Sequence, residues 1–139
     1  MYSLLTGAMS SQTYIGCEHR HGIFGLVAPN AMFVDLLRLS VIDDVIRQDE
    51  LHLLRLVPVA WVTADYETKF ENMPTQFGPV TLKFRLSEDE KTFLVTFEPK
   101  FRLKPNKVVL HAPPVSGLSQ VIVNGREYKA KPGDALILR

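Results

Sequence analysis

The sequence has one cysteine, almost no net charge and no long apolar run, and each of these absences excludes a class of protein. Because Cys17 is alone, no disulfide framework can form within the chain. Sixteen basic against fifteen acidic residues give a formal net charge of +1, so the charge balance shows no nucleic-acid footprint. No segment approaches the roughly 20 consecutive apolar residues of a membrane-spanning helix, so we expect no membrane partner.

Targeting and cofactor motifs are also missing. Residues 1–8 (MYSLLTGA) have neither the basic start nor the sustained apolar run of a signal peptide. We therefore expect a soluble chain without an export address of its own, although a parent protein could still be exported. No nucleophile elbow, phosphate loop or dinucleotide fingerprint occurs, so no cofactor is expected.

Short alternating segments dominate the sequence after residue 50. Residues 80–86 (VTLKFRL) alternate apolar and polar side chains, as a half-buried strand does. Residues 120–123 lead into Asn124-Gly125, a strong hairpin signal because both positions tolerate positive φ. Further strands are predicted at residues 51–56, 67–71, 92–97, 108–111 and 135–138. We therefore predict a mainly β fold, an antiparallel β-sandwich of about seven or eight strands formed by residues 49–139.

Residues 1–48 differ from the sandwich in character. They begin with a loop, and residues 31–46 repeat apolar side chains at the spacing of one amphipathic helix face. Asp43 and Asp44 either end or kink this helix, or begin a short further turn through Ile46. A single helix cannot bury its apolar face alone. It must pack on the sandwich, on a second copy of the chain or on a larger protein.

The densest group of functional side chains lies at residues 17–21 (CEHRH). Cys17, His19 and His21 are metal-ligating types, and Glu18 could act as a general acid or base. A fourth ligand and the usual zinc spacings are missing, so we expect no metal site here. Glu18, His19 and His21 remain the catalytic candidates, with packing of a polar loop as the favoured interpretation.

Two histidines and the tryptophan lie in apolar surroundings. His52 and His111 each fall inside an apolar strand, where a partly buried, hydrogen-bonded role is commoner than a ligand role. Trp61 and Tyr66, with Phe70 and Phe77, could form an aromatic platform on which a sugar ring stacks. The favoured alternative is that Trp61 closes one end of the sandwich core.

Three segments have the pattern of a known family: residues 51–61 (LHLLRLVPVAW), 72–80 (NMPTQFGPV) and 121–126 (VIVNGR). They resemble the C-terminal β-sandwich region of large bacterial proteins related to (α/α)6-barrel, or six-hairpin, glycoside hydrolases. In such proteins a helical toroid ends in a helix like residues 30–46, and a segment like residues 51–61 then enters the sandwich. The shared motifs are structural, so the resemblance assigns no catalytic residue.

The resemblance implies a non-catalytic accessory domain of a glycoside-hydrolase-like protein involved in carbohydrate degradation. Residues 1–48 would be the remnant of the helical toroid, and the partner would be a helical catalytic domain, a second copy of the chain or a polysaccharide. Two alternatives stay open. One is a small free-standing hydrolase that uses Glu18, His19 and His21; the other is a sugar-binding module with Trp61 and Tyr66 as its platform.

Overall fold

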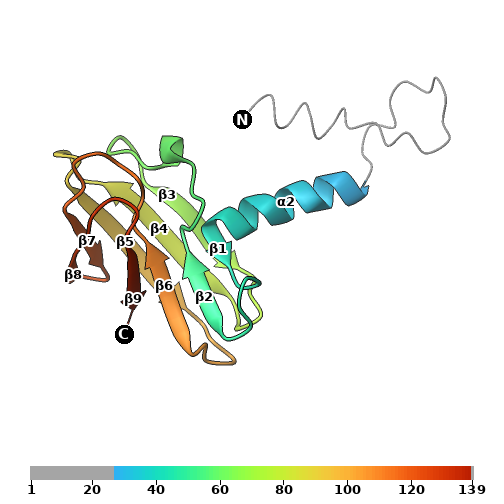
Figure 1. Cartoon of the computed structure of the whole chain (residues 1–139). Coiled ribbons are helices and arrows are strands. Elements are labelled where there is room, and N and C mark those ends of the chain that lie inside the picture. Colours follow the sequence, from blue (N-terminus) through green and yellow to red (C-terminus); the bar gives the residue numbers. More distant parts are fainter. Residues whose placement is uncertain (1–26, 139) are drawn as a thin grey trace, which may run out of the picture. The chain divides into compact units, whose positions relative to one another are not determined.

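The computed structural model describes residues 27–138 (Figure 1). One compact unit begins at Leu39 and holds the nine strands of the described residues, and its boundary with the preceding unit falls inside helix α2 (Val27–Val41). α2 therefore begins before the predicted residue 31, because a proline such as Pro29 is tolerated in a first helical turn, where its missing N–H is not needed.

The prediction that the helix could extend to Ile46 is wrong. α2 ends at Val41, and Ile42–Asp43 form the short strand β1. Asp43 Oδ1 accepts hydrogen bonds from the backbone N–H groups of Val45 (3.0 Å) and Ile46 (3.1 Å). A side chain that binds the next N–H groups in this way offers the backbone an alternative to helical hydrogen bonds.

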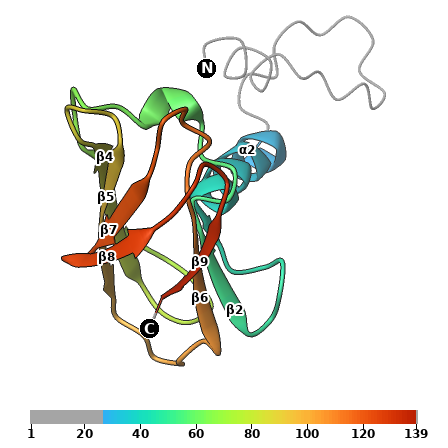
Figure 2. The ribbon, with the colours of Figure 1, turned by 60° about the vertical axis from the view of Figure 1, so that its left-hand side comes forward.

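The strands form two sheets that face one another in two layers (Figure 2). The four-stranded sheet has the order β1-β2-β6-β9, and the five-stranded sheet has the order β3-β4-β5-β7-β8. The four-stranded sheet adds to β1 the strands β2 (Glu50–Leu53), β6 (Lys107–His111) and β9 (Ala135–Leu138). The five-stranded sheet consists of β3 (Thr68–Met73), β4 (Val80–Leu86), β5 (Thr92–Pro99), β7 (Gln120–Val123) and β8 (Arg126–Lys129).

The predicted β-sandwich with one helix is confirmed, with one difference in strand direction. Most neighbouring strands are antiparallel, but β2–β6 and β5–β7 pair in parallel. Parallel neighbours need a long crossover, and β2 and β6 are separated in sequence by three strands of the other sheet. The chain thus leaves the four-stranded sheet after β2 and returns to it at β6.

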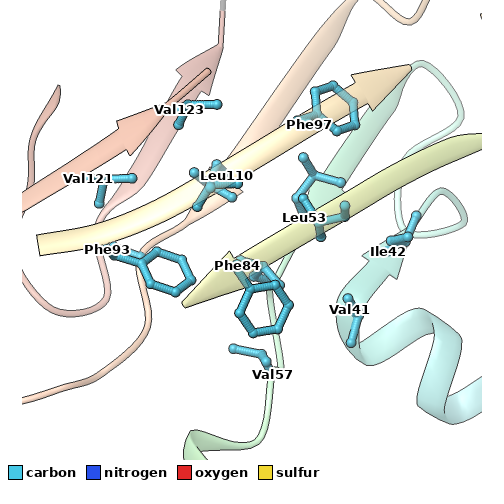
Figure 3. Packing of buried hydrophobic residues seen from close by; sticks show 14 of the residues in the cluster. Val41, Ile42, Leu53, Val57, Phe84, Phe93, Phe97, Leu110, Val121 and Val123 are labelled. Atoms are coloured by element: carbon cyan, nitrogen blue, oxygen red, sulfur yellow. The ribbon is translucent and has the colours of Figure 1, made fainter. Parts of the chain in front are cut away.

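The core lies between the two sheets (Figure 3). Leu53 and Leu110 from the four-stranded sheet and Phe84, Phe93 and Val121 from the five-stranded sheet are each at most 1% exposed. The Phe84 ring lies 5.7 Å from that of Phe93, centroid to centroid, in a tilted arrangement that aromatic pairs favour. Alternate residues of each strand supply these side chains, so the opposite residues face outward.

The Asn124-Gly125 hairpin is confirmed between β7 and β8. Asn124 has φ of 49° and Gly125 has φ of 81°, the left-handed conformations that a tight hairpin turn requires. The side-chain amide of Asn124 also makes hydrogen bonds like those of a paired strand residue. Its Oδ1 accepts a hydrogen bond from Phe97 N (2.8 Å), and its Nδ2 donates one to Phe97 O (2.7 Å). The parallel β5–β7 pairing is thereby continued by a side chain.

A polar latch joins the turn after β1 to the turn after β3. Gln76 N donates to Asp44 Oδ2 (2.6 Å), and the Gln76 side-chain amide donates to the carbonyl oxygens of Asp44 and Gln48. Asp44 is 5% exposed, and the hydrogen bond from Gln76 satisfies its buried carboxylate. The latch connects the two sheets at one end of the sandwich.

Candidate functional sites

The predicted catalytic candidates Glu18, His19 and His21, together with Cys17, lie outside the described residues. Their role as a polar loop, a catalytic group or a ligand set stays a prediction.

Trp61 ends the short 3-10 helix η1 (Val59–Trp61), which follows Pro58. Its indole ring is partly buried, packs against the core and lies 5.9 Å from the ring of Phe70, centroid to centroid. The Trp61 carbonyl accepts a hydrogen bond from Thr68 Oγ1 (2.8 Å), which ties η1 to β3. The ring thus lies at the margin of the core, with part of its surface open.

Tyr66 lies beside the same turn. Tyr66 is 52% exposed, and its hydroxyl group donates a hydrogen bond to the carbonyl oxygen of Ala60 (3.1 Å). Phe77, in contrast, is 2% exposed and belongs to the core, so it takes no part in an aromatic surface. Of the four aromatic residues considered from the sequence, Phe77 is therefore excluded from an exposed platform, and the role of Trp61 and Tyr66 as a sugar platform stays a prediction.

A different group, the histidine cluster, was not predicted from the sequence. It consists of Glu50 and His52 of β2 with Lys107 and His111 of β6. Leu51 and Leu53 of β2 and Val108 and Leu110 of β6 pack in or against the core, and these four polar residues occupy the opposite face of the four-stranded sheet. Strand alternation therefore places them together once β2 and β6 are neighbours.

The members of the histidine cluster form a continuous chain of polar contacts. His52 Nδ1 lies 3.0 Å from His111 Nε2, and His52 Nε2 lies 3.1 Å from Glu50 Oε2. Glu50 Oε1 in turn accepts from Lys107 Nζ at 3.2 Å, and Arg47 Nη1 lies 3.6 Å from the same oxygen. The side chains of Glu50 and His52 are only 13% exposed, so these contacts are largely shielded from water.

The contacts allow the protons of the neutral cluster to be assigned. An ionised carboxylate only accepts, so we place the hydrogen of His52 on Nε2, facing Glu50. His52 Nδ1 is then an acceptor, and His111 Nε2 must donate to it. In this arrangement Nδ1 of His111 carries no hydrogen, and none of the hydrogen bonds of residues 27–138 given by the structure involves it.

Two pKa shifts reflect this environment. The hydrogen bond from Lys107 lowers the pKa of Glu50 below its ordinary value, opposed by desolvation and helped by His52 and the charge of Arg47. Burial lowers the pKa of His111, and the positive charges of His52 and Arg55 lower it further, while Asp43 raises it. His111 is therefore held in its neutral form more firmly than a free imidazole.

The prediction that His52 and His111 are partly buried and hydrogen-bonded is confirmed, but their contact with each other was missed. The two residues are 59 positions apart, and they meet only because β2 and β6 pair in parallel. No local pattern in either strand identifies its neighbour. A weak signal existed, since His52 stands between Leu51 and Leu53 and His111 between Leu110 and Ala112, and strand alternation turns each histidine away from these buried neighbours.

An open cleft lies over β7 and β8, with a volume of about 770 Å³. Its lining includes no aromatic residue, and its polar side chains belong to Ser119, Gln120, Glu127, Lys129, Lys131 and Asp134. Residues 27–138 contain no group of three or more histidine, cysteine, aspartate or glutamate side chains arranged to hold a metal ion. Within the same range, no helix is both long and apolar enough to cross a membrane.

Comparison of the chain with protein-family models, with curated proteins and with solved structures finds no significant match.

Proposed function

We propose that this chain is a non-catalytic accessory β-sandwich domain of a glycoside-hydrolase-like protein involved in carbohydrate degradation. In this role α2 supplies an apolar surface that packs against a helical catalytic domain, while the sandwich provides a rigid support. The resemblance of residues 51–61, 72–80 and 121–126 to the C-terminal region of such proteins suggests the partner.

The observation that carries the proposal is the apolar surface of α2. Met32 and Leu36, which lie about one turn apart on the same side of the helix, are 66% and 64% exposed, and Val34 on the opposite side is 64% exposed. Full burial of a side chain of this size contributes roughly 1.5–3 kcal/mol, so the exposed pair Met32 and Leu36 favours a covering partner. The helix continues into the sandwich without a linker, since Val41 is its last residue and Ile42 begins β1. A partner that binds α2 is therefore attached to a helix that continues directly into the first strand of the sandwich.

The buried polar groups of the sandwich support a structural role. Asp43 binds Arg55 and two backbone N–H groups, Asp44 binds Gln76, and Thr81 Oγ1 accepts from the backbone of Asn72. Each of these buried side chains thus holds a turn or a strand end. Among the described residues, no buried side-chain polar atom lacks a hydrogen-bond partner. Satisfied groups of this kind fix a single packing of the domain.

Hydrolysis assays test the non-catalytic part of the proposal. The purified chain should release no product from aryl glycosides or from soluble polysaccharides. A turnover that disappears in the Glu18→Gln variant would overturn the proposal and favour the small hydrolase built on Glu18, His19 and His21.

Association measurements test the packing part. If the coding region upstream encodes a helical toroid in the same reading frame, the toroid and this chain, expressed as two polypeptides, should co-purify. The double variant Met32→Lys, Leu36→Lys should abolish that association, because two ammonium groups cannot be buried in an apolar interface. The control Gln48→Lys adds a positive charge to an exposed position of the sandwich and should leave association unchanged. Association that survives the double variant would contradict the proposed surface.

A further inference from the structure

We propose that Glu50, His52 and His111 form a proton-sensitive joint between β2 and β6, which accommodates one added proton and loses its central hydrogen bond on the second. This inference stands apart from the accessory role, because none of its residues belongs to α2 and it needs no partner.

The cluster is called a joint because its side-chain contacts span the pairing of β2 with β6. β2 and β6 pair in parallel over four positions, from Glu50↔Lys107 to Leu53↔Leu110. This pairing is the connection between the β1–β2 half and the β6–β9 half of the four-stranded sheet. The cluster crosses it twice, through Glu50–Lys107 and through His52–His111. Changes in these contacts therefore act directly on the pairing.

One added proton leaves both contacts of His52 intact. A protonated His52 donates from both ring nitrogens, from Nε2 to Glu50 and from Nδ1 to His111. His111 remains neutral and accepts at Nε2 once its own hydrogen lies on Nδ1. The added charge is then next to the Glu50 carboxylate, at 3.1 Å. The first proton thus converts a neutral hydrogen bond into a charge-assisted one.

A second added proton cannot be accommodated without losing the hydrogen bond between His52 and His111. When both rings are imidazolium ions, all four ring nitrogens carry hydrogen and none can accept. His52 Nδ1 and His111 Nε2 then face each other as two donors at a separation of 3.0 Å, and the ring centroids are 5.3 Å apart. The hydrogen bond is lost, and two positive charges remain on adjacent strands.

The surrounding charges strengthen this asymmetry. Asp43 of β1 lies opposite His52 in the strand register and is paired with Arg55. Arg47 from the turn after β1 and Lys107 of β6 both contact Glu50. The residues of β9 on this face, Ala135 and Ile137, are uncharged. Three cations, Arg47, Arg55 and Lys107, therefore face two anions, Asp43 and Glu50, before either ring is protonated. The lowered pKa of His111 agrees with this balance.

The sign of the pH effect follows from the lowered pKa of His111. As the pH falls below the ordinary imidazole pKa of about 6.5, His111 of the unfolded chain takes up a proton before that of the folded chain. The stability contributed by the neutral form is therefore complete above that pH. It is lost as the pH falls from there through the folded-state pKa.

Urea unfolding at pH 7.5 and pH 5.5 tests the joint. The wild-type folding constant should decrease several-fold on acidification, whereas the His111→Gln variant should lose most of this decrease. A glutamine amide still donates to His52 Nδ1 but takes up no proton. The control His19→Gln removes an imidazole elsewhere in the chain and should keep the decrease. An equal decrease in wild type and His111→Gln would overturn the proposal.

Hydrogen exchange on the wild-type protein provides a test that needs no variant to fold. Protection factors, corrected for the intrinsic effect of pH, should fall on acidification for the backbone amides of β2 and β6. In β4 and β5, which carry no part of the cluster, protection should fall by no more than the global folding constant measured with urea. Protection that is unchanged in β2 and β6, or that falls in β4 and β5 more than in β2 and β6, would contradict a joint at this pairing.

Discussion

The two sheets are held together in different ways. β4 and β5 pair over seven positions in the five-stranded sheet, and the rings of Phe70, Phe84 and Phe93 pack in a row on its inner face. β2 and β6 pair over only four positions in the four-stranded sheet, and their outer face carries the histidine cluster. Both sheets contribute to one core, and the four-stranded sheet adds to it the chain of contacts in the histidine cluster.

The difference indicates that apolar packing stabilises mainly the five-stranded sheet, whereas polar side-chain contacts add to the stability of the four-stranded sheet. Long strands bury enough apolar surface to hold a pairing by packing, and this contribution does not depend on protonation. Short strands bury less, and here polar contacts across β2 and β6 supplement them. The five-stranded sheet should therefore respond most to changes in side-chain volume, and the four-stranded sheet to changes in pH.

The largest effect is expected from Phe84→Ala in the five-stranded sheet. Phe84 is 1% exposed and lies between the rings of Phe70 and Phe93, so its removal leaves a cavity and breaks both ring contacts. We expect a loss of about 3–5 kcal/mol in the free energy of unfolding, measured with urea. Leu110→Ala is the matched change in the four-stranded sheet and should cost less, about 2–3 kcal/mol. A larger loss for Leu110→Ala would reverse the comparison.

Trp61→Ala should cost about 2 kcal/mol, less than the loss at a fully buried aromatic residue, because the indole ring is only partly buried. Urea unfolding gives this value, and affinity electrophoresis in gels containing polysaccharide tests the sugar platform separately. Tyr66→Ala should cost less than about 1 kcal/mol, since it removes one exposed hydrogen bond. Retardation in such gels that is lost in Tyr66→Ala, with stability unchanged, would favour the sugar-binding module.

Gly78→Ala and Gly133→Ala compare the glycine-containing turns that precede one strand of each sheet, β4 and β9. Gly78 precedes β4, has φ of 122°, and a Cβ there would lie 2.5 Å from the carbonyl oxygen of Lys100. Gly133 precedes β9, has φ of 83° and has open space around the same position. We expect a loss of about 2–3 kcal/mol for Gly78→Ala and about 1 kcal/mol for Gly133→Ala, because only the first adds a clash with backbone. Equal thermal shifts for the two variants would contradict the close approach at Gly78.

The smallest effect is expected from Glu50→Gln. The pKa of Glu50 is lowered in the folded chain, so the unfolded chain takes up its proton first as the pH falls below about 4.5. Stability from this group is present above that pH and is lost as the pH falls through the folded pKa. Glu50→Gln should flatten this part of the stability curve, measured by urea unfolding between neutral and acidic pH. Lys107→Met is the control, and it should move the pKa of Glu50 upward in an NMR titration.

The sequence predicts the local parts of this fold well. The strands at residues 80–86, 120–123 and 135–138 have the predicted bounds, because alternation and turn chemistry act within a few residues. The same reasoning extended the helix past Val41, since Ile42 continues its apolar spacing. Only the pairing of Ile42 with Leu53 shows that it belongs to a strand.

The histidine cluster also could not be predicted from local sequence patterns, because it depends on the pairing of two strands that are distant in the sequence. Each histidine was predicted to be partly buried and hydrogen-bonded, which follows from the residues around it. Their contact depends on the parallel pairing of β2 and β6, which are separated by the three strands β3 to β5. A pattern within one strand does not specify which distant strand becomes its neighbour.

The hydrogen bonds of Asn124 bear on the chemical ageing of the protein. In Asn-Gly sequences the backbone nitrogen of the glycine attacks the asparagine side chain, and ammonia is released through a succinimide. Here both side-chain atoms of Asn124 are held by the backbone of Phe97, which opposes the rotation needed for that attack. Deamidation at this position should therefore be slow in the folded protein and fast after unfolding, as peptide mapping of stored samples would show. Once formed, an aspartate would present a carboxylate to the Phe97 carbonyl oxygen, so damage at this one turn would remove the side-chain hydrogen bond that extends the β5–β7 pairing beyond its four backbone positions.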